Sequence, residues 1–315
     1  MDYISPNVLI ISNLHDYSTD HVVYQLNKME IPYLRLNRDQ FSGYKIYLNP
    51  ESNTLSGFTK EFQFEIEPES LNSIYFRAPI YLRANPRTIL PVEEQLSRSQ
   101  WASFLRSLVI FEDVLWVNDP KATYNAETKP YQLKIAKKIG FNIPKTLITN
   151  SIPSKNFFGE KIVVKTLDPA IFNLGDQESF IYSNIIYFEE LSNSDLSSSP
   201  IILQEALIPK IDVRVTVVKN FVFAVTIKKG DKGIDMDWRL EKDNLEYDVI
   251  ELPSKIRDKC IRLLKELELN FGCIDLIIHN GNYYFIEINP TGEWDWLMHN
   301  LNLNIDKKIA KLLTG

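Results

Sequence analysis

Apolar runs alternate with amphipathic stretches at the start of the chain. Residues 8–12 are apolar up to a closing serine, residues 21–28 repeat apolar positions at helical spacing, and residues 33–35 begin a second apolar run. A run of four or five apolar residues predicts a buried strand, and repeats three or four residues apart predict a helix. The opening of the chain therefore predicts a β-α-β unit.

The same patterns continue to residue 118 and complete an N-terminal α/β lobe. They predict a helix over residues 92–110 and strands over residues 45–48, 62–66, 73–76 and 114–117. Asn118, Asp119 and Pro120 follow, and such a tripeptide is typical of a turn between units. We therefore expect a first domain over residues 1–118.

The rest of the chain predicts two further α+β lobes. We expect helices over residues 129–139, 253–269 and 305–313, and strands over residues 146–149, 161–165, 201–203, 213–218 and 221–227. Lys219 and Asn220 separate the last two strands, which predicts a tight hairpin. A loop rich in serine and asparagine over residues 191–200 divides the region into domains of residues 119–200 and 201–315.

Two apolar runs near the end of the chain carry carboxylates. Asp275 lies within residues 273–278, and Glu287 and Asn289 lie within residues 284–290. Burying a carboxylate in an apolar strand is costly unless a cation compensates it, and clustered oxygen ligands suit magnesium. The runs therefore predict a Mg²⁺ site, with an ordinary hairpin whose acids face solvent as the alternative.

This site depends on the turn between the two strands. The two carboxylates share a face only if the turn has an odd number of residues, because side chains alternate along a strand. We expect a three-residue turn over residues 280–282, with Gly281 in the left-handed conformation. This register places Cys273 and Phe285 on the face of the acids, and Asn289, two residues beyond the second acid, joins them.

Composition narrows the class of protein. A chain of 315 residues that is 44% hydrophobic and 24% charged is typical of a soluble globular protein with two or three lobes. Its net charge of −6 argues against nucleic-acid binding, which favours a basic surface. The chain has no apolar run that could cross a membrane and no basic signal region, so we expect a cytoplasmic protein.

Several kinds of catalytic site are excluded as well. The two cysteines, Cys260 and Cys273, lie in apolar segments and are expected to be buried thiols. The four histidines lack zinc-ligand spacing, and the sequence has neither a nucleophile elbow nor a Walker glycine motif. The sequence therefore argues against a zinc enzyme and against the common nucleophilic hydrolases.

Two lysines and a short polar segment supply further candidates. Lys165 ends an apolar strand, where an ammonium group can neutralise a polyphosphate, and Lys129 opens a helix. Residues 204–207 follow a strand and could hold a purine through backbone groups, and Asp212 is placed to meet a ribose hydroxyl. Each candidate taken alone is unspecific, because most lysines are solvated surface charges.

Taken in order, these residues resemble the ATP-grasp ligase pattern over about residues 119–296. The matching residues are Lys129, Lys165, Gln204, Glu205, Ala206, Leu207, Asp212, Asp275, Glu287 and Asn289. The resemblance implies an α+β ATP-grasp fold after an α/β pre-ATP-grasp domain. It further implies ATP held between two lobes, with its phosphates on the two lysines and Mg²⁺ on the last three residues.

Four parts of the sequence are similar to the peptide-macrocyclising branch of this family, the ligases that make graspetides such as microviridins and plesiocin. They are residues 75–79, 116–133, 212–218 and 287–296. The first motif more often has a second arginine where this chain has Ala78. The branch implies that ATP phosphorylates an Asp or Glu side chain of a precursor peptide. A hydroxyl or amine of the same peptide then closes an ester or amide ring.

The branch also implies further residues and partners. Arg214 and Arg239 are candidates for holding the acceptor carboxylate, because a guanidinium fork suits it better than an ammonium group, and a structural ion pair is the alternative. The tip of the phosphate-covering loop is expected at residues 173–177. The implied partner is a precursor peptide with leader and core, docking around residues 188–199 and 213–227. Homodimers are common in the family.

Two other functions stay open at this point. A RimK-like or glutathione-synthetase-like ligase, which joins amino acids or short peptides, would share the ATP site and differ only on the acceptor side. A non-catalytic nucleotide-binding regulatory protein is the other alternative, and the intact acids and lysines argue against it. Loss of one water per ring from a co-expressed precursor would distinguish the three functions.

Overall fold

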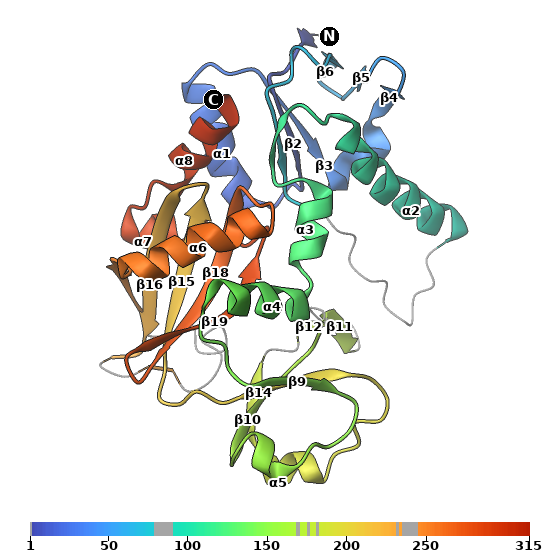
Figure 1. Ribbon diagram of the computed structural model, residues 1–315. Helices are drawn as coiled ribbons and strands as arrows, with labels where there is room; N and C mark the ends of the chain where they lie inside the picture. The colour runs from blue at the N-terminus through green and yellow to red at the C-terminus, as the bar shows by residue number, and fades with distance from the viewer. Residues whose placement is uncertain are drawn as a thin grey trace.

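Five sheets carry the part of the chain that this computed structural model describes, namely residues 2–78, 91–167, 171–174, 177–180, 183–230, 233–234 and 245–315. Figure 1 shows the N-terminal lobe at the top, the central lobe at the bottom and the C-terminal sheet at the left. Helices α1 (Tyr17–Lys28) and α8 (Ile305–Thr314) pack against each other. Elements from the two ends of the chain therefore meet in the fold.

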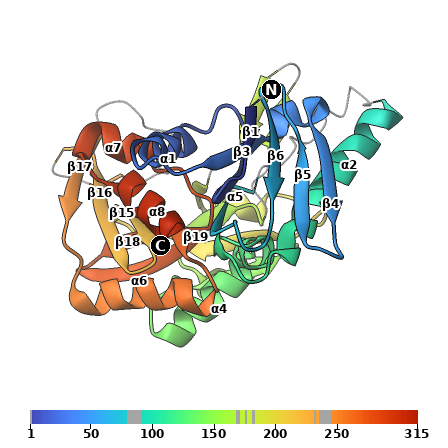
Figure 2. The same cartoon turned by 90° about the horizontal axis from the view of Figure 1, so that it is seen from above.

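The N-terminal lobe is built on two sheets (Figure 2). The parallel sheet has the order β3 (Tyr33–Asn37), β2 (Val8–Ser12), β7 (Ser73–Phe76) and β8 (Leu115–Val117). The mixed sheet has the order β1 (Asp2–Ile4), β6 (Phe62–Ile66), β5 (Thr54–Phe58) and β4 (Lys45–Asn49). The helical segments are η1 (Arg38–Gly43), α2 (Val92–Ser107) and η2 (Leu108–Ile110).

The central lobe is a small antiparallel sheet with one short α-helix among its described residues. The strand order is β13 (Asn184–Tyr187), β10 (Lys161–Lys165), β14 (Ile201–Glu205) and β9 (Thr146–Thr149). The remaining elements are η3 (Lys155–Phe157), α5 (Phe188–Ser192) and a separate hairpin of β11 (Ile171–Leu174) and β12 (Gln177–Phe180).

The C-terminal sheet is antiparallel and is covered by helices on both faces. Its order is β17 (Glu246–Ile250), β16 (Phe221–Lys228), β15 (Ile211–Val218), β18 (Phe271–His279) and β19 (Asn282–Asn289). One face packs on α3 (Pro120–Ala126), α4 (Lys129–Ile139) and α6 (Ser254–Glu266). The other face packs on α7 (Asp295–Leu301) and α8.

The hydrophobic clusters show how the lobes are joined. One buried cluster combines Val8 and Tyr75 of the N-terminal lobe with Phe271 and Ile309 of the C-terminal lobe. The central lobe has a separate small cluster around Ile162. The N-terminal and C-terminal lobes therefore share a core, whereas the central sheet is packed on its own. The domain boundaries expected at residues 118 and 200 stay a prediction.

Most predicted helices and strands occur at or near their expected positions. One sequence feature that predicted a turn between domains instead marks the start of a helix. The tripeptide at residues 118–120 starts a helix, because the Asp119 side chain accepts a hydrogen bond from the backbone N–H of Ala122 and Pro120 occupies the first turn. The elements without a sequence prediction are short, such as β1, β13 and α7, or lie at a sheet edge, such as β17.

The hairpin of β18 and β19 differs from the prediction at its turn. His279 is paired with Asn282, so the turn contains only Asn280 and Gly281. Both turn residues have positive φ, 48° and 74°, which is the geometry that an Asn-Gly pair favours in a two-residue hairpin. The prediction of a three-residue turn was therefore wrong.

A β-bulge restores the register that the two acids need. Asp275 lies opposite Glu287, whereas the next residue, Leu276, lies opposite Phe285, so Ile286 is an extra residue in β19. One extra residue changes the parity of the strand and offsets the even turn. The two acids therefore share a face as predicted. Phe285 instead joins the hydrophobic cluster of the opposite face, contrary to the prediction.

Candidate active site

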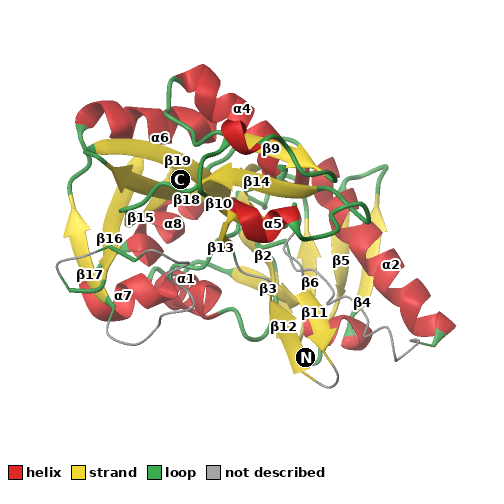
Figure 3. Cartoon of the chain, turned by 90° about the horizontal axis from the view of Figure 1, so that it is seen from below, coloured by secondary structure: helices red, strands yellow, loops and turns green. Residues whose placement is uncertain are grey.

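A cavity is lined by residues of the central sheet and of the C-terminal sheet. Figure 3 shows these two sheets next to each other. The central sheet lines the cavity with Val163, Lys165, Ile185 and Gln204, and the C-terminal sheet lines it with Asp212, Arg214, Ile227, Asp275, Ile286 and Glu287. Apolar and charged side chains therefore face the same space. Such a cavity suits a ligand that has both a flat apolar part and an anionic part.

Two carboxylates from adjacent strands form one end of this cavity. Asp275 and Glu287 are opposite each other on β18 and β19 and are only 20% and 16% exposed. Arg214 Nη1 donates to Asp275 Oδ1 at 2.8 Å, and Lys129 Nζ lies 3.8 Å from Glu287 Oε2. The two cations compensate the charge of the acids, so both acids can stay ionised at a partly buried position.

The donor set at this end fits a magnesium ion. Asn289 is paired with Cys273 at the next same-face position, so an amide joins the two carboxylates on one face. Oxygen atoms of carboxylates and amides are ligands that a hard divalent cation accepts. Asp275, Glu287 and Asn289 are thus the residues that would hold Mg²⁺.

A lysine and a glutamine meet at the wall formed by the central sheet. Lys165 Nζ donates to Gln204 Oε1 at 2.9 Å, and Gln204 Nε2 donates to Thr146 Oγ1 at 2.9 Å. These contacts link three strands of the sheet and fix where the ammonium group lies. The sequence placed Lys165 and Gln204 in one site, and the structure brings both to the cavity.

The segment after β14 was expected to hold a purine. Glu205 and Leu207 line the cavity, with Ala206 between them. The backbone N–H of Glu205 donates to Lys145 O at 2.8 Å, and its side chain accepts from Lys145 N at 3.1 Å. The backbone N–H of Glu205 is therefore already engaged. The backbone N–H groups of this segment that can bind a purine are those of Ala206 and Leu207.

Lys210 lines the cavity without having been singled out from the sequence. It is 9% exposed and forms an ion pair with Asp212, the residue expected at the ribose. The signal was available in the sequence, because residues two apart at the start of a strand point to the same side. Lys210 therefore adds a second lysine to the cavity.

Arg214 is the buried arginine of the site. Its Nη1 donates to Asp275 and its Nη2 donates to the backbone oxygen of Glu293 at 3.1 Å. Burial lowers the pKa of Arg214, but the charges of Asp275 and Glu287 and the hydrogen bond to Asp275 together outweigh it, and the pKa is raised above the ordinary value. The ion pair that the sequence left open is thus present. Arg239 lies outside the described residues.

Two predictions concern groups expected near the phosphates, namely the tip of the covering loop and Lys129. The predicted tip of the phosphate-covering loop is the connection between β11 and β12, of which residues 175 and 176 lie outside the described residues. Lys129, at the start of α4, also donates to Thr166 O at 3.3 Å, just after β10. Lys129 therefore touches both the acidic end and the segment that leads to this hairpin.

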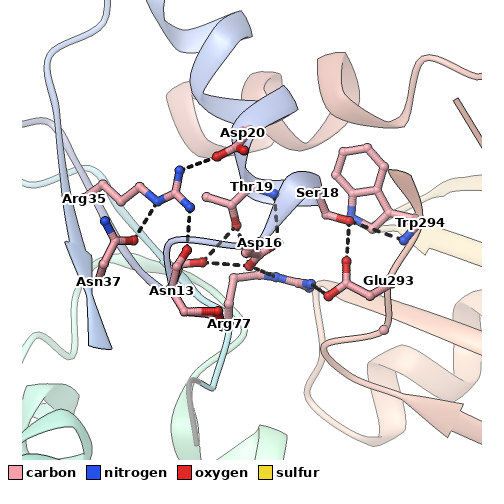
Figure 4. Close-up of polar contacts among 12 residues, drawn as sticks. Asn13, Asp16, Ser18, Thr19, Asp20, Arg35, Asn37, Arg77, Glu293 and Trp294 are labelled. Carbon is pink, nitrogen blue, oxygen red and sulfur yellow. Dashed lines mark hydrogen bonds and ion pairs between the residues drawn. The ribbon is translucent and has the colours of Figure 1, made fainter. Parts of the chain in front are cut away.

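A polar network next to the site was not predicted as functional. Arg77, which follows β7, lies between Asp16 of the N-terminal lobe and Glu293 of the loop after β19 (Figure 4). The sequence motifs contained Arg77 and Glu293 but gave neither a partner. Only the fold brings these residues together, because 216 positions separate them.

A family model described as a RimK-like ATP-grasp domain matches residues 189–313. These residues include the metal-binding face, the hinge segment and Arg214. The chain has an ATP-grasp fold. The fold class and the ligase type predicted from the sequence are therefore confirmed. No curated protein matches the chain.

Solved ATP-grasp structures match the chain over nearly its whole length. A RiPP-associated ATP-grasp ligase of Chryseobacterium gregarium, in complex with ADP and a leader and core peptide, has 26% identity and a TM-score of 0.82, covering 100% of this chain and 97% of that one. The macrocyclase MdnC of Microcystis aeruginosa MRC, bound with precursor peptide MdnA, has 22% identity and a TM-score of 0.83, with coverages of 98% and 99%.

A third ATP-grasp structure contains a metal. The ligase PsnB, complexed with a phosphomimetic variant of a minimal precursor, Mg and ADP, has 18% identity and a TM-score of 0.75, covering 99% of this chain and 98% of that one. The likeness thus includes the N-terminal lobe, which the family model does not reach.

Among the described residues, none of the helices is long and apolar enough to span a membrane.

Proposed function

We propose that this protein is an ATP-dependent ligase that closes side-chain-to-side-chain ester or amide macrocycles in a ribosomal precursor peptide. One observation carries the proposal: the cavity between the two lobes gathers Lys165, Asp275 and Glu287 in a fold that matches, end to end, a ligase solved with ADP and with leader and core peptides. The RimK-like family model covers only residues 189–313, within the ATP-grasp region that both kinds of ligase share, so it does not separate the RimK-type alternative on the acceptor side.

The cavity residues divide the binding of ATP between them. Lys165 and Lys129 supply positive charge for the phosphates, the backbone of residues 206 and 207 meets the base, and Asp212 meets the ribose. Mg²⁺ held by Asp275, Glu287 and Asn289 would lower the cost of bringing a carboxylate and a triphosphate together. These roles follow the order of the residues along the chain, which is that of the ATP-grasp pattern.

The proposed ring closure consists of two nucleophilic substitution steps. An oxygen of the peptide carboxylate attacks the γ-phosphorus, and ADP leaves with the electrons of the broken P–O bond. A hydroxyl or amine of the same peptide then attacks the acyl carbon, loses its proton, and inorganic phosphate leaves. The peptide thereby loses the elements of one water for each ring. ATP provides the free energy, so no oxidant or reductant takes part.

Two arginines are proposed to assist the acceptor carboxylate. Arg214 lies at the cavity beside Asp275, so its charge is already fixed next to the reacting groups. Preorganised charge of this kind stabilises a transition state without reorganisation. Arg239 is proposed as the second arginine on the sequence resemblance alone.

The test uses mass spectrometry of a precursor peptide. Short acidic peptides encoded by genes next to the gene of this protein are incubated with the protein, ATP and Mg²⁺. The expected result is that the peptide loses one water per ring. Glu287→Gln should keep ADP binding and abolish the dehydrated product. Asp258→Asn, on an exposed part of α6, is the control and should keep both. ATP-dependent joining of free amino acids by the wild type would instead assign the RimK-type function.

Three parts of the proposal concern the surroundings of the site. The leader is proposed to dock near residues 188–199 and the β15–β16 hairpin. The protein is proposed to act as a homodimer in the cytoplasm. Truncation of the precursor at its leader, together with light scattering of the purified protein, tests the first two points.

A further inference from the structure

Arg77 connects the N-terminal lobe to the loop that follows the metal-binding strand. Its Nε donates to Asp16 Oδ2 at 3.0 Å, and its Nη2 donates to Glu293 Oε1 at 2.8 Å (Figure 4). The Arg77 side chain is only 3% exposed. A buried guanidinium with a carboxylate on each side holds both in fixed positions, because its planar fork has preset donor directions.

The anchor on the N-terminal side is rigid. Asp16 caps α1 and accepts hydrogen bonds from Thr19 N at 3.0 Å, Thr19 Oγ1 at 2.8 Å and Ser12 Oγ at 2.7 Å. Burial raises the pKa of Asp16, but Arg77 and these donors outweigh it and hold the pKa at about 2. Asp16 is therefore ionised at neutral pH, and Arg77 has a charged partner.

Glu293 passes this anchoring on to the active site. Its side chain accepts from Arg77 and, at 2.7 Å, from Ser18 Oγ of α1. Its backbone oxygen accepts from Arg214 Nη2 at 3.1 Å, and Arg214 Nη1 donates to Asp275 at 2.8 Å. An unbroken series of polar contacts thus runs from the N-terminal lobe to a proposed Mg²⁺ ligand.

The loop that carries Glu293 has little room to move. A Cβ atom on Gly292 would lie 2.7 Å from Cys273 Cβ and 2.9 Å from Arg214 Nη2. On its other side the loop is held by Trp294, whose residue exposure is 0%. The backbone oxygen of Glu293 that holds Arg214 therefore belongs to a loop that is packed on both sides.

We propose that Arg77 is a positioning residue of the active site, through which the N-terminal lobe fixes Glu293, Arg214 and thereby Asp275. The inference rests on the proposed function for its activity readout but not for its metal readout. Groups that orient metal ligands through hydrogen bonds commonly change metal affinity or activity by about 10- to 100-fold when they are removed.

The test compares Arg77→Lys and Glu293→Gln with Arg35→Lys. Lysine keeps the charge but cannot hold two carboxylates in a fork, and glutamine removes the charge that Arg77 binds. We expect both variants to bind Mn²⁺ in the presence of ADP about 10-fold or more weakly by electron paramagnetic resonance. We also expect kcat for ring closure to fall by a similar factor, with KM for ATP changed little. Arg35→Lys makes the same exchange at an arginine of the N-terminal lobe that contacts Asn37 and Asn13 O rather than Asp16 or Glu293, and it should keep the Mn²⁺ affinity and kcat of the wild type.

Thermal unfolding of the same variants separates positioning from stability. If Arg77→Lys and Glu293→Gln unfold at lower temperature while Mn²⁺ affinity stays that of the wild type, Arg77 is structural and the proposal is overturned. The double variant provides a second criterion: because both residues act through one contact, its loss should be close to that of either single variant, and additive losses contradict the proposal. Weakened Mn²⁺ binding without any peptide product from the wild type would leave this inference standing and reject the proposed function.

Discussion

Each of the two carboxylates proposed to bind Mg²⁺ has a cationic neighbour from a different element. Arg214 pairs with Asp275 across two strands, and Lys129, at the start of α4, lies beside Glu287. Each acid thus has a cation that offsets its charge where solvent is partly excluded. Removing a single cation therefore changes the charge of the site as well as one contact.

Replacing Lys165 by alanine tests the phosphate role directly. A hydrogen bond to a charged group contributes about 1.5–3 kcal/mol, so we expect Lys165→Ala to weaken ADP binding by about 10- to 100-fold. Isothermal titration calorimetry measures the affinity. Lys161→Ala is the control, because Lys161 begins the same strand but is exposed and lies over the ring of Tyr187. Equal affinities of the two variants would remove Lys165 from the nucleotide site.

Asp16 gives the protein a pH-dependent stability. Its pKa is lowered from 3.8 to about 2 in the folded chain, so its stabilisation is complete above about pH 4 and is lost as the pH falls through 2. The shift corresponds to about 2 kcal/mol. We expect Asp16→Asn to be less stable than the wild type by this order at pH 7, with a smaller difference at pH 3. Urea unfolding at both pH values measures it, and an unchanged difference would contradict the assigned pKa.

At the scale of elements, the strongest sequence signals were periodic and the weakest were irregular. The strands β6, β7, β9 and β10 and the helix α4 have their predicted ends, because their apolar spacing is uninterrupted. The bulge at Ile286 has no such signal, because it depends on how two strands pair. The shared face of the acids was predicted correctly, although the turn expected to produce it was not.

The loop after β19 allows a prediction at this scale. Gly292→Ala adds a methyl group against Cys273 and Arg214, and such overpacking costs about 1–3 kcal/mol. We expect it to lower both stability and Mn²⁺ affinity. Gly281→Ala is the control, because its φ of 74° makes alanine unfavourable by about 1 kcal/mol or more but nothing lies within 4 Å of the new methyl group. Gly281→Ala should lose stability only, and unaltered metal affinity in Gly292→Ala would show that the loop tolerates displacement.

Over the molecule as a whole, the lobes were predicted from the sequence, but the contacts between them were not. Arg77 lies in a sequence motif and Asn118 at an expected boundary, yet their partners in the C-terminal lobe lie more than 150 positions away. Hydrophobic period determines which residues are buried but not which distant polar groups meet. The shared core of the N-terminal and C-terminal lobes was missed for the same reason.

Asn118 offers a test of how the lobes are joined. Its Nδ2 donates to Phe271 O at 2.9 Å and Pro290 O at 3.0 Å, and its Oδ1 accepts from Asn270 N at 2.7 Å and Phe271 N at 3.0 Å. Asn118→Ala leaves these buried backbone groups without partners, so we expect a loss of about 2–5 kcal/mol. Calorimetry of thermal unfolding measures the loss.

A neighbouring position provides the comparison for Asn118. Thr123→Val removes a hydrogen bond within α3, from the Thr123 hydroxyl to Asp119 O, while keeping the side-chain volume, and should cost much less than Asn118→Ala. Similar losses for the two variants would mean that the four contacts of Asn118 contribute little to joining the lobes.

The extra residue in β19 affects how this chain should be aligned with other sequences. A two-residue turn with a bulge and a three-residue turn without one place the same two acids opposite each other, since twelve positions separate Asp275 from Glu287 in either case. An alignment that fixes the turn and inserts a gap there would move one acid out of its column. The separation between the two carboxylates, rather than the length of the turn, is therefore the criterion for recognising this site in distant sequences.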